Sequence, residues 1–224
     1  SIYNPSIYDG GAITCQNCNI NTTQCDPKGI TYVTACLQAI NREFEKYILK
    51  NDLSATTSGG CLIVSANNTI LDGQGYSISR IPEIGGERGI SVGSLNNITI
   101  KNISRISGFG IGIELSGSSN ISLSYLTIFG NSIINCGVNA NAGGISVLNG
   151  GDIFISSSNI SGNCGAGIYT NSNGITINNN YICGNLIWAD VLCPPTTPMS
   201  IFGSNNIGAR THGWLYRCEM SNLI

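Results

Sequence analysis

Four segments of the chain repeat one another, and this repetition limits the possible fold more than any other feature of the sequence. Each segment has a Gly-Ile start, a polar turn, a short strand of alternating apolar residues and a second polar corner. The two apolar landmarks of the repeat recur at Ile90, Ile113, Ile145 and Ile168, and at Ile98, Ile121, Ile153 and Ile175. Both series advance by about 23, 32 and 22–23 residues, and one insertion of about nine residues near 131–142 explains both long steps.

A period in the low twenties, with Gly, Asn and Ser at the corners, is typical of a solenoid in which one repeat forms one turn. Alternation places Ile98 and Ile100 on one face of their strand and Thr99 on the other. Stacked turns would bring such Ile and Leu side chains into columns about 4.8 Å apart. Leucine-rich repeats need a Leu framework that this sequence lacks, and a β-sandwich would not shift two landmarks together. The sequence therefore predicts an all-β chain, a parallel β-helix of about 22–23 residues per turn.

The region before the clear repeats predicts a different organisation. Apolar residues within 34–50 fall at helical spacing, with charged residues on the opposite side, which predicts one amphipathic helix. These apolar residues are Cys36, Leu37, Ile40, Phe44, Tyr47 and Ile48. A helix over the first turn would protect its open edge. We therefore divide the chain into residues 1–60, a Cys-rich segment with a capping helix at about 34–50, and 61–224, the β-helix with an irregular C-terminal tail.

Ten cysteines are an even and unusually large number for a chain of this length. Cys15 and Cys18 have the spacing of a zinc knuckle, but no second Cys-x-x-Cys pair follows, so structural disulfides are favoured over zinc. We expect no metal and no cofactor. The expected bridges join Cys136 to Cys164 and Cys183 to Cys193, with the four N-terminal cysteines pairing among themselves. The ten predicted disulfide cysteines are Cys15, Cys18, Cys25, Cys36, Cys61, Cys136, Cys164, Cys183, Cys193 and Cys218.

Composition indicates where such a chain would work. Charged residues make up 10% of the chain, against about 25% in an ordinary soluble domain. The formal net charge of −2 argues against binding to nucleic acid or to anionic membranes, and no apolar run approaches the ~20 residues that span a bilayer. The chain starts at Ser1 without an initiator Met, which is consistent with removal of a signal peptide. We expect an extracellular or cell-surface protein.

Asn-x-Ser/Thr sequons mark candidate sites for covalent N-glycans. Their number is close to the roughly five expected by chance in a chain so rich in Asn, Ser and Thr, so only their positions carry information. The predicted sites are Asn21, Asn67, Asn97, Asn102, Asn120 and Asn159. Asn97 and Asn120 take the same place in consecutive repeats, and we place Asn102 and Asn159 together at another. An inward-facing asparagine ladder is the alternative at the second place.

Residues Asn67–Ile78 (NNTILDGQGYSI), followed by turns of the Asn-Ile-Thr-Ile type, resemble the right-handed parallel β-helix superfamily. Within that superfamily the chain resembles NosD-like repeat proteins and secreted archaeal surface proteins. Cell-surface β-helix proteins with Gly-Gly-Ala-Ile elements are a looser match at Gly10–Ile13 and Ala142–Ile145. The resemblance covers about residues 61–185 and implies a right-handed β-helix. It says little about function, because this architecture hosts lyases, hydrolases, adhesins and structural proteins.

A polysaccharide lyase or hydrolase would need paired carboxylates, or a carboxylate-bound calcium with a basic residue. Glu87, Glu114 and Asp152 do not fall in equivalent columns of the repeats. The segment Asp72–Gly75 resembles one common in polygalacturonases, but Asp and Gly also suit a tight corner, and we interpret it as structural. His212, the only histidine, has no carboxylate nearby in the sequence. We therefore expect no catalytic residues and no enzyme.

Two non-enzymatic functions remain. The first is a self-assembling structural subunit of an extracellular filament, sheath or surface layer, whose partners are copies of itself. An open solenoid end is a template for stacking, and Ile2–Ile13 has strand character that suits donation to a neighbour. The second is a monomeric adhesin or carbohydrate-binding module, although no row of aromatic residues recurs along one face. We favour assembly.

Overall fold

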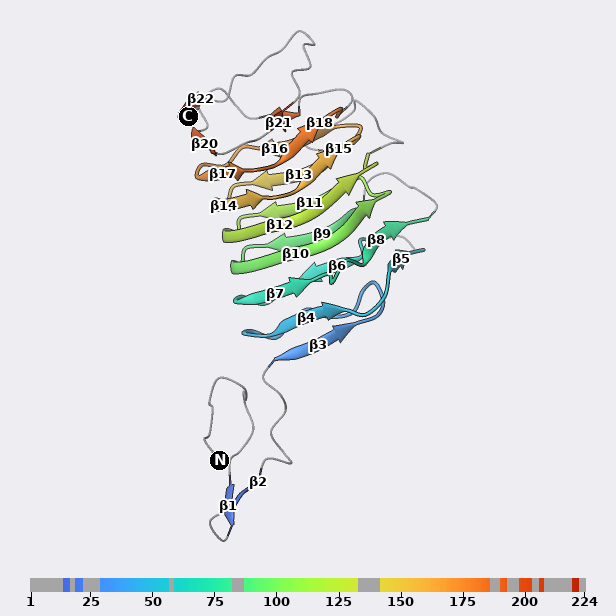
Figure 1. The fold of residues 1–224 in the computed structure, drawn as a ribbon, viewed down its shortest axis with the longest axis vertical. Coiled ribbons are helices and arrows are strands. Elements are labelled where there is room, and N and C mark those ends of the chain that lie inside the picture. Colours follow the sequence, from blue (N-terminus) through green and yellow to red (C-terminus); the bar gives the residue numbers. More distant parts are fainter. Residues whose placement is uncertain are drawn as a thin grey trace.

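The computed structural model describes residues 14–16, 19–21, 29–56, 59–81, 87–132, 142–185, 190–192, 198–202, 206–207 and 219–221, with side chains from 29 to 192. These residues form strands and connecting turns, and none of them is helical (Figure 1). Within this part of the chain, no helix could span a membrane. A short antiparallel pair, β1 (Thr14–Gln16) with β2 (Asn19–Asn21), is separate from two larger sheets of 14 and six strands. Every ladder of the larger sheets is parallel.

The parallel strands stack in three columns (Figure 1). The first column contains β3 (Ile30–Val33), β4 (Lys46–Leu49), β7 (Thr69–Asp72), the first halves of β10 (Asn96–Ser107) and β12 (Ser119–Phe129), β14 (Gly151–Ser156), β17 (Ile175–Asn178), β20 (Pro198–Phe202) and β22 (Glu219–Ser221). The second contains β5 (Leu53–Ala55), β8 (Ser77–Arg80), the second halves of β10 and β12, β15 (Asn159–Ser161), β18 (Tyr181–Cys183) and β21 (Asn206–Ile207). The third contains β6 (Leu62–Val64), β9 (Arg88–Gly93), β11 (Ile111–Ser116), β13 (Gly143–Leu148), β16 (Ala166–Thr170) and β19 (Val191–Leu192). The arrangement is compatible with a solenoid.

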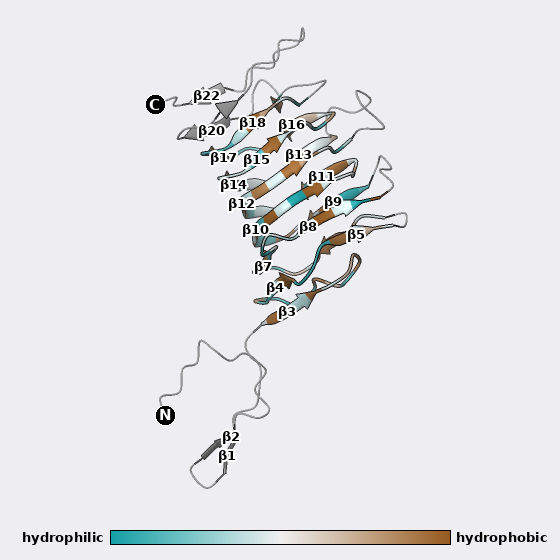
Figure 2. Ribbon diagram, turned by 45° about the vertical axis from the view of Figure 1, so that its right-hand side comes forward, coloured by the Kyte–Doolittle hydropathy of each residue, from teal (hydrophilic) through white to brown (hydrophobic). Residues whose placement is uncertain are grey.

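The register of the sheets follows the sequence repeat. The first landmark residues pair in order from β9 to β16, and the second pair in order from β10 to β17. All eight of these isoleucines are at most 1% exposed, which confirms that the repeated apolar positions face the interior. Figure 2 shows the resulting alternation of hydrophobic and hydrophilic residues along the strands, for example along β11.

Steric crowding explains why a glycine precedes the first landmark in each repeat. A Cβ atom on Gly112 would lie 2.7 Å from the carbonyl oxygen of Gly144, and one on Gly89 would lie 2.6 Å from that of Gly112. Real Cβ atoms do not approach a carbonyl oxygen so closely, so a side chain here would push neighbouring strands apart. The recurring Gly-Ile pair thus marks where backbones of successive repeats come closest.

Left-handed residues make the corner between the first and second columns. Asn102 in β10 and Tyr125 in β12 have φ of 57° and 55°, and each splits its long strand into two segments that pair with different neighbours. The registers place Ser157 and Asn179 at the same corner, with φ of 49° and 54°. Asn tolerates this conformation better than most residues do, because its short polar side chain hydrogen-bonds locally.

An inward row of asparagines runs through the core. Asn131, Asn163 and Asn185 are 0% exposed. The Nδ2 atom of Asn131 donates to Oδ1 of Asn163 at 3.0 Å, and that of Asn163 donates to Oδ1 of Asn185 at 3.0 Å. The row ends on Asp190, whose Oδ1 accepts from Nδ2 of Asn185 at 2.8 Å. A carboxylate suits the acceptor end of such a row because it has no hydrogen to donate.

The predicted capping helix at residues 34–50 is wrong. The segment forms turns, an isolated bridge from Ile40 to Val64, and the strand β4. Ile40, Tyr47 and Leu49 are buried, but Leu37 is 61% exposed, so the apolar residues do not form one helical face. Pairing with β3 on one side and β7 on the other satisfies the β4 backbone, and a short apolar run cannot reveal that tertiary opportunity. The parallel sheets therefore already include β3, β4 and β5, before residue 61.

Candidate functional site

The end of the stack at β3 is the candidate functional site. In the part of the chain that the structure describes, β3 pairs with β4 alone. The amides of Lys46 and Lys50 bond to the carbonyls of Gly29 and Val33. Because backbone groups alternate in direction along a strand, the N–H and C=O groups of Ile30 and Tyr32 point away from β4. We call residues 30–45, which contain β3 and the connection to β4, the terminal segment.

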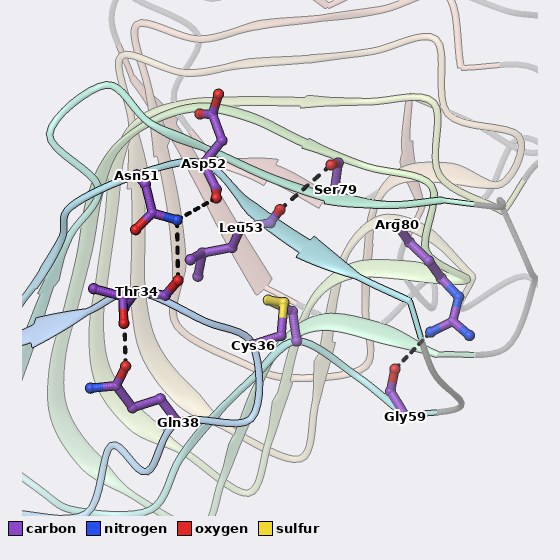
Figure 3. Close-up of a disulfide and its surroundings, with 10 residues drawn as sticks. Thr34, Cys36, Gln38, Asn51, Asp52, Leu53, Gly59, Ser79 and Arg80 are labelled. Carbon is purple, nitrogen blue, oxygen red and sulfur yellow. Dashed lines mark hydrogen bonds between the residues drawn. A yellow bond between two sulfur atoms is a disulfide. The ribbon is translucent and has the colours of Figure 1, made fainter.

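The side chain of Gln38 covers part of this edge. Its Nε2 donates to the carbonyl oxygen of Tyr32 at 2.6 Å, and its Oε1 accepts from the amide of Thr34 at 3.0 Å. Figure 3 shows the Gln38 side chain next to Thr34. The amide group thus makes the same pair of bonds that a neighbouring strand would make. The outward N–H and C=O groups of Ile30 and the N–H group of Tyr32 take no part in these two bonds.

Exposed apolar side chains gather on the terminal segment. Ile30 is 43% exposed, Tyr32 50%, Leu37 61% and Phe44 63%. Leu37 and Phe44 also have φ of 65° and 61°, a conformation that large apolar residues seldom adopt. Several exposed apolar side chains beside an open strand edge are typical of an interaction site.

A disulfide attaches the terminal segment to the start of β6. Cys36 is bonded to Cys61, next to β6, with Cα atoms 4.4 Å apart (Figure 3). The amide of Leu37 also donates to the carbonyl oxygen of Cys61 at 2.6 Å. A bridge closing a loop of this length stabilises a fold by about 3 kcal/mol, mainly by restricting the unfolded chain. The apolar end of the stack is thereby held in place.

The predicted disulfide pairing can be compared with the structure for three of the cysteines. Cys36 pairs with Cys61 and not with Cys15, Cys18 or Cys25, so the expectation of pairing among the four N-terminal cysteines is wrong for Cys36. Cys164 is disulfide-bonded, while its expected partner Cys136 lies outside the described residues. Cys183 has a free thiol, so the expected bridge to Cys193 is not formed. The thiols of Cys15, Cys18, Cys25, Cys193 and Cys218 lie outside the described side chains.

The predicted glycosylation residues lie in different environments. Asn97, Asn120 and Asn159 are exposed, whereas Asn67 and Asn102 are half-buried, and the Asn21 side chain is not described. Asn97 and Asn120 take equivalent places, as predicted, and Nδ2 of Asn120 donates to Oδ1 of Asn97 at 3.4 Å.

Asn102 and Asn159 do not share a place, contrary to the sequence prediction. Asn102 is at the bend of β10, while Asn159 pairs with Thr127 and Tyr181 on the second column. Neither belongs to the inward row, which Asn131, Asn163 and Asn185 form. That row had a signal in the sequence, because its members advance by the same steps as the isoleucine landmarks.

The corner at Asp72 is a compact charge cluster. The Asp72 side chain is 4% exposed, and its Oδ2 lies 3.0 Å from Nζ of Lys46 and 4.0 Å from Nζ of Lys101. Its Oδ1 accepts from the amide of Gln74 at 3.2 Å and from Nδ2 of Asn102 at 3.1 Å. Burial opposes the charged form, but the hydrogen bonds from Asn102, Lys46 and Gln74 outweigh burial and lower the pKa of Asp72. These contacts agree with the structural interpretation of this corner.

Other acidic residues have similar local partners. Glu114 accepts from Nε of Arg88 at 2.6 Å, and Asp52 accepts from the Ser77 amide at 2.7 Å. Among the described side chains, no three His, Cys, Asp or Glu residues group closely enough to hold a metal ion. His212 and the segment Ile2–Ile13 lie outside the described residues. Gln38 was missed by the sequence analysis, and nothing local in the sequence marks it.

No protein-family model, no curated protein and no solved structure matches this chain.

Proposed function

We propose that the chain is a right-handed parallel β-helix that serves as a structural subunit outside the cell and assembles end to end with copies of itself. In this proposal it is a secreted, disulfide-stabilised and N-glycosylated protein without catalytic activity. The three columns of parallel strands support the β-helix, and the handedness follows the resemblance to NosD-like repeat proteins and the general preference for right-handed parallel crossovers.

One observation carries the assembly proposal, namely the combination of an open strand edge with exposed apolar residues on the terminal segment. The outward backbone groups of Ile30 and the amide of Tyr32 offer hydrogen bonds to an added strand. The four exposed apolar side chains offer surface that association would remove from water. A head-to-tail contact of this kind leaves the far end of each copy open, and so produces filaments when the rotation does not close.

We propose a protein without catalytic activity because the carboxylates of Asp72 and Glu114 are held by salt bridges and hydrogen bonds. Asp72 is held by two lysines and two hydrogen bonds, and Glu114 by an arginine. A general acid or base needs a carboxyl group that can exchange its proton with a substrate. Carboxylates fixed in this way act as acceptors that hold corners and strands together.

The test is self-association of the purified, non-reduced protein across a range of concentrations, measured by negative-stain electron microscopy and sedimentation velocity. We expect filaments or linear oligomers for the wild-type protein. Tyr32→Lys should shift the chain toward monomer, because it places a charge on the open edge. Phe154→Lys is the matched control, since Phe154 is 39% exposed but lies on β14, which pairs with β12 and β17 in the middle of the stack.

Two results would contradict the proposal. One is that the wild-type protein remains monomeric at every concentration. The other is that Phe154→Lys reduces association as strongly as Tyr32→Lys, because the effect would then reflect added charge in general and not the β3 edge.

A further inference from the structure

A pocket of about 400 Å³ opens beside the corner between the first and second columns. It spans neighbouring turns, with residues from the β7–β8 turn and from the bends of β10 and β12. Apart from Gly75 and Ile103, the lining is polar or aromatic and consists of Gln74, Asn102, Ser104, Tyr125 and Thr127. The assembly proposal does not use this pocket.

Tyr125 is the unusual residue of the lining. It has a φ of 55° at a corner position where other turns place Asn102, Ser157 and Asn179. A bulky aromatic residue is disfavoured in this conformation, whereas Asn is among the residues that accept it best. The side chain of Tyr125 is nevertheless 64% exposed, so core packing does not explain its presence. A strained backbone that presents an exposed ring at a pocket indicates a binding role.

The rest of the lining is neutral and rich in hydrogen-bonding groups. Gln74 supplies an amide, and Ser104 and Thr127 supply hydroxyls, so donors and acceptors of both kinds are present. None of the residues that line the pocket is charged. A charged ligand would therefore find no opposite charge in the lining.

We propose that this corner pocket binds an uncharged sugar unit of a glycan, with the sugar ring against Tyr125. The hydroxyl groups of the sugar bond to Gln74, Ser104 and Thr127. An exposed tyrosine combines apolar contact area with little loss of conformational entropy on binding, and a few placed polar groups then fix the orientation of the ligand. Nucleobases also stack on aromatic rings, but their phosphates require a basic groove, and no basic residue lines this pocket.

The inference is independent of end-to-end assembly, because the pocket shares no residue with the terminal segment. The experiment presents labelled protein to an array of neutral and acidic oligosaccharides, and measures the affinity of the strongest neutral hit by titration. Three proteins are compared: the wild type, Tyr125→Asn, and the control Tyr181→Asn. Tyr181 is also an exposed tyrosine, at 45%, and it lies on β18 outside the pocket.

We expect the wild type to bind at least one neutral oligosaccharide, and Tyr125→Asn to bind it about tenfold more weakly or not at all. Tyr181→Asn should bind as the wild type does. Because Asn relieves the left-handed strain, Tyr125→Asn should also keep its melting temperature or raise it by about 2 °C. A loss of binding with an unchanged melting temperature separates a binding role from a structural one.

Three outcomes would overturn the inference. The wild type could bind no neutral oligosaccharide on the array, or bind acidic ones only. Alternatively, Tyr125→Asn could retain wild-type affinity, which would remove the ring from the site.

Discussion

At the scale of single residues, buried hydrogen bonds explain positions that hydrophobicity does not. Asn163 is 0% exposed, and its Nδ2 donates to the carbonyl oxygen of Ile128 at 3.1 Å as well as to Asn185. Its Oδ1 accepts from both the amide and Nδ2 of Asn131. Each of these groups would be costly to leave unpaired in the interior. The row therefore holds neighbouring turns in one register.

We predict that Asn163→Ala lowers the free energy of unfolding by about 3 kcal/mol, because buried groups on both sides of Asn163 lose their partners. Chemical denaturation of the unglycosylated protein measures the change. Asn159→Ala is the control, since Asn159 is exposed and lies four residues away in the sequence. Its effect should stay within about 0.5 kcal/mol. Equal effects of the two substitutions would contradict a special role for the row.

At the scale of elements, the Gln38 side chain occupies part of the open edge of the terminal strand β3, through the two hydrogen bonds that a neighbouring strand would make. Gln38 occupies the carbonyl oxygen of Tyr32 and the amide of Thr34 through both ends of its amide group. Natural proteins protect open sheet edges by several such devices, because an unprotected edge pairs with other chains. A partly covered edge would make association weaker and more selective than a fully open one.

We predict that Gln38→Ala strengthens self-association, because it uncovers two more backbone groups of the β3 edge. Sedimentation velocity should show an apparent dissociation constant about fivefold lower than that of the wild type. Asn41→Ala, which removes another exposed amide from the terminal segment, is the control. Weaker or unchanged association of Gln38→Ala would mean that neighbours do not pair with this edge.

At the scale of the whole molecule, long-range links decide how the first turn joins the rest of the stack. The Cys36–Cys61 disulfide connects residues separated by 25 positions. The isolated parallel β-bridge between Ile40 and Val64 lies close to this disulfide in the sequence. The interior of the stack is one continuous cluster of apolar side chains, from Val33 to Ile182. Loss of the disulfide should therefore destabilise the terminal segment first, since among the described residues β3 pairs with a neighbouring strand on one side alone.

We predict that replacing Cys36 and Cys61 together with serine lowers the free energy of unfolding by about 3 kcal/mol. Thermal and chemical denaturation of the non-reduced proteins would show it. Cys183→Ser is the matched control, because this thiol is free and half-buried, and it should leave stability nearly unchanged. Peptide mapping without reduction should recover the Cys36–Cys61 pair. Failure to find that pair would contradict the assignment.

Much of the fold could be predicted from the sequence, because a sequence repeat that forms the same backbone geometry each time is compatible with few folds. Alternation along each strand and the matched steps of the two isoleucine series gave the inward residues and their registers. The conformation of residues 34–50 could not be predicted in this way. Their apolar residues fit a helical spacing, and only the pairing of β4 with β3 and β7 shows that the last part of this segment is a strand.

The candidate site was not predicted from the sequence. The sequence predicts an open solenoid end as a template for stacking, but it also predicts a helix over the first turn, which would have covered the β3 edge. The roles of Gln38 and Tyr125 depend on contacts with residues far along the chain or on a backbone conformation, and neither leaves a local pattern. The pairing of Cys36 with Cys61 was likewise hidden, since cysteine spacing does not define connectivity.

The sequence by itself thus determined the strand periodicity, the inward isoleucines and the glycines at close backbone approaches, because these properties repeat with the chain and depend on local geometry. The tertiary structure alone decided which strand edge lacks a partner strand among the described residues, which amide side chain covers part of it and which cysteines pair. It also decided that Asp72 is neutralised by Lys46 and Lys101. These features depend on the distance between side chains that stacking brings together, and no spacing along the chain encodes that distance.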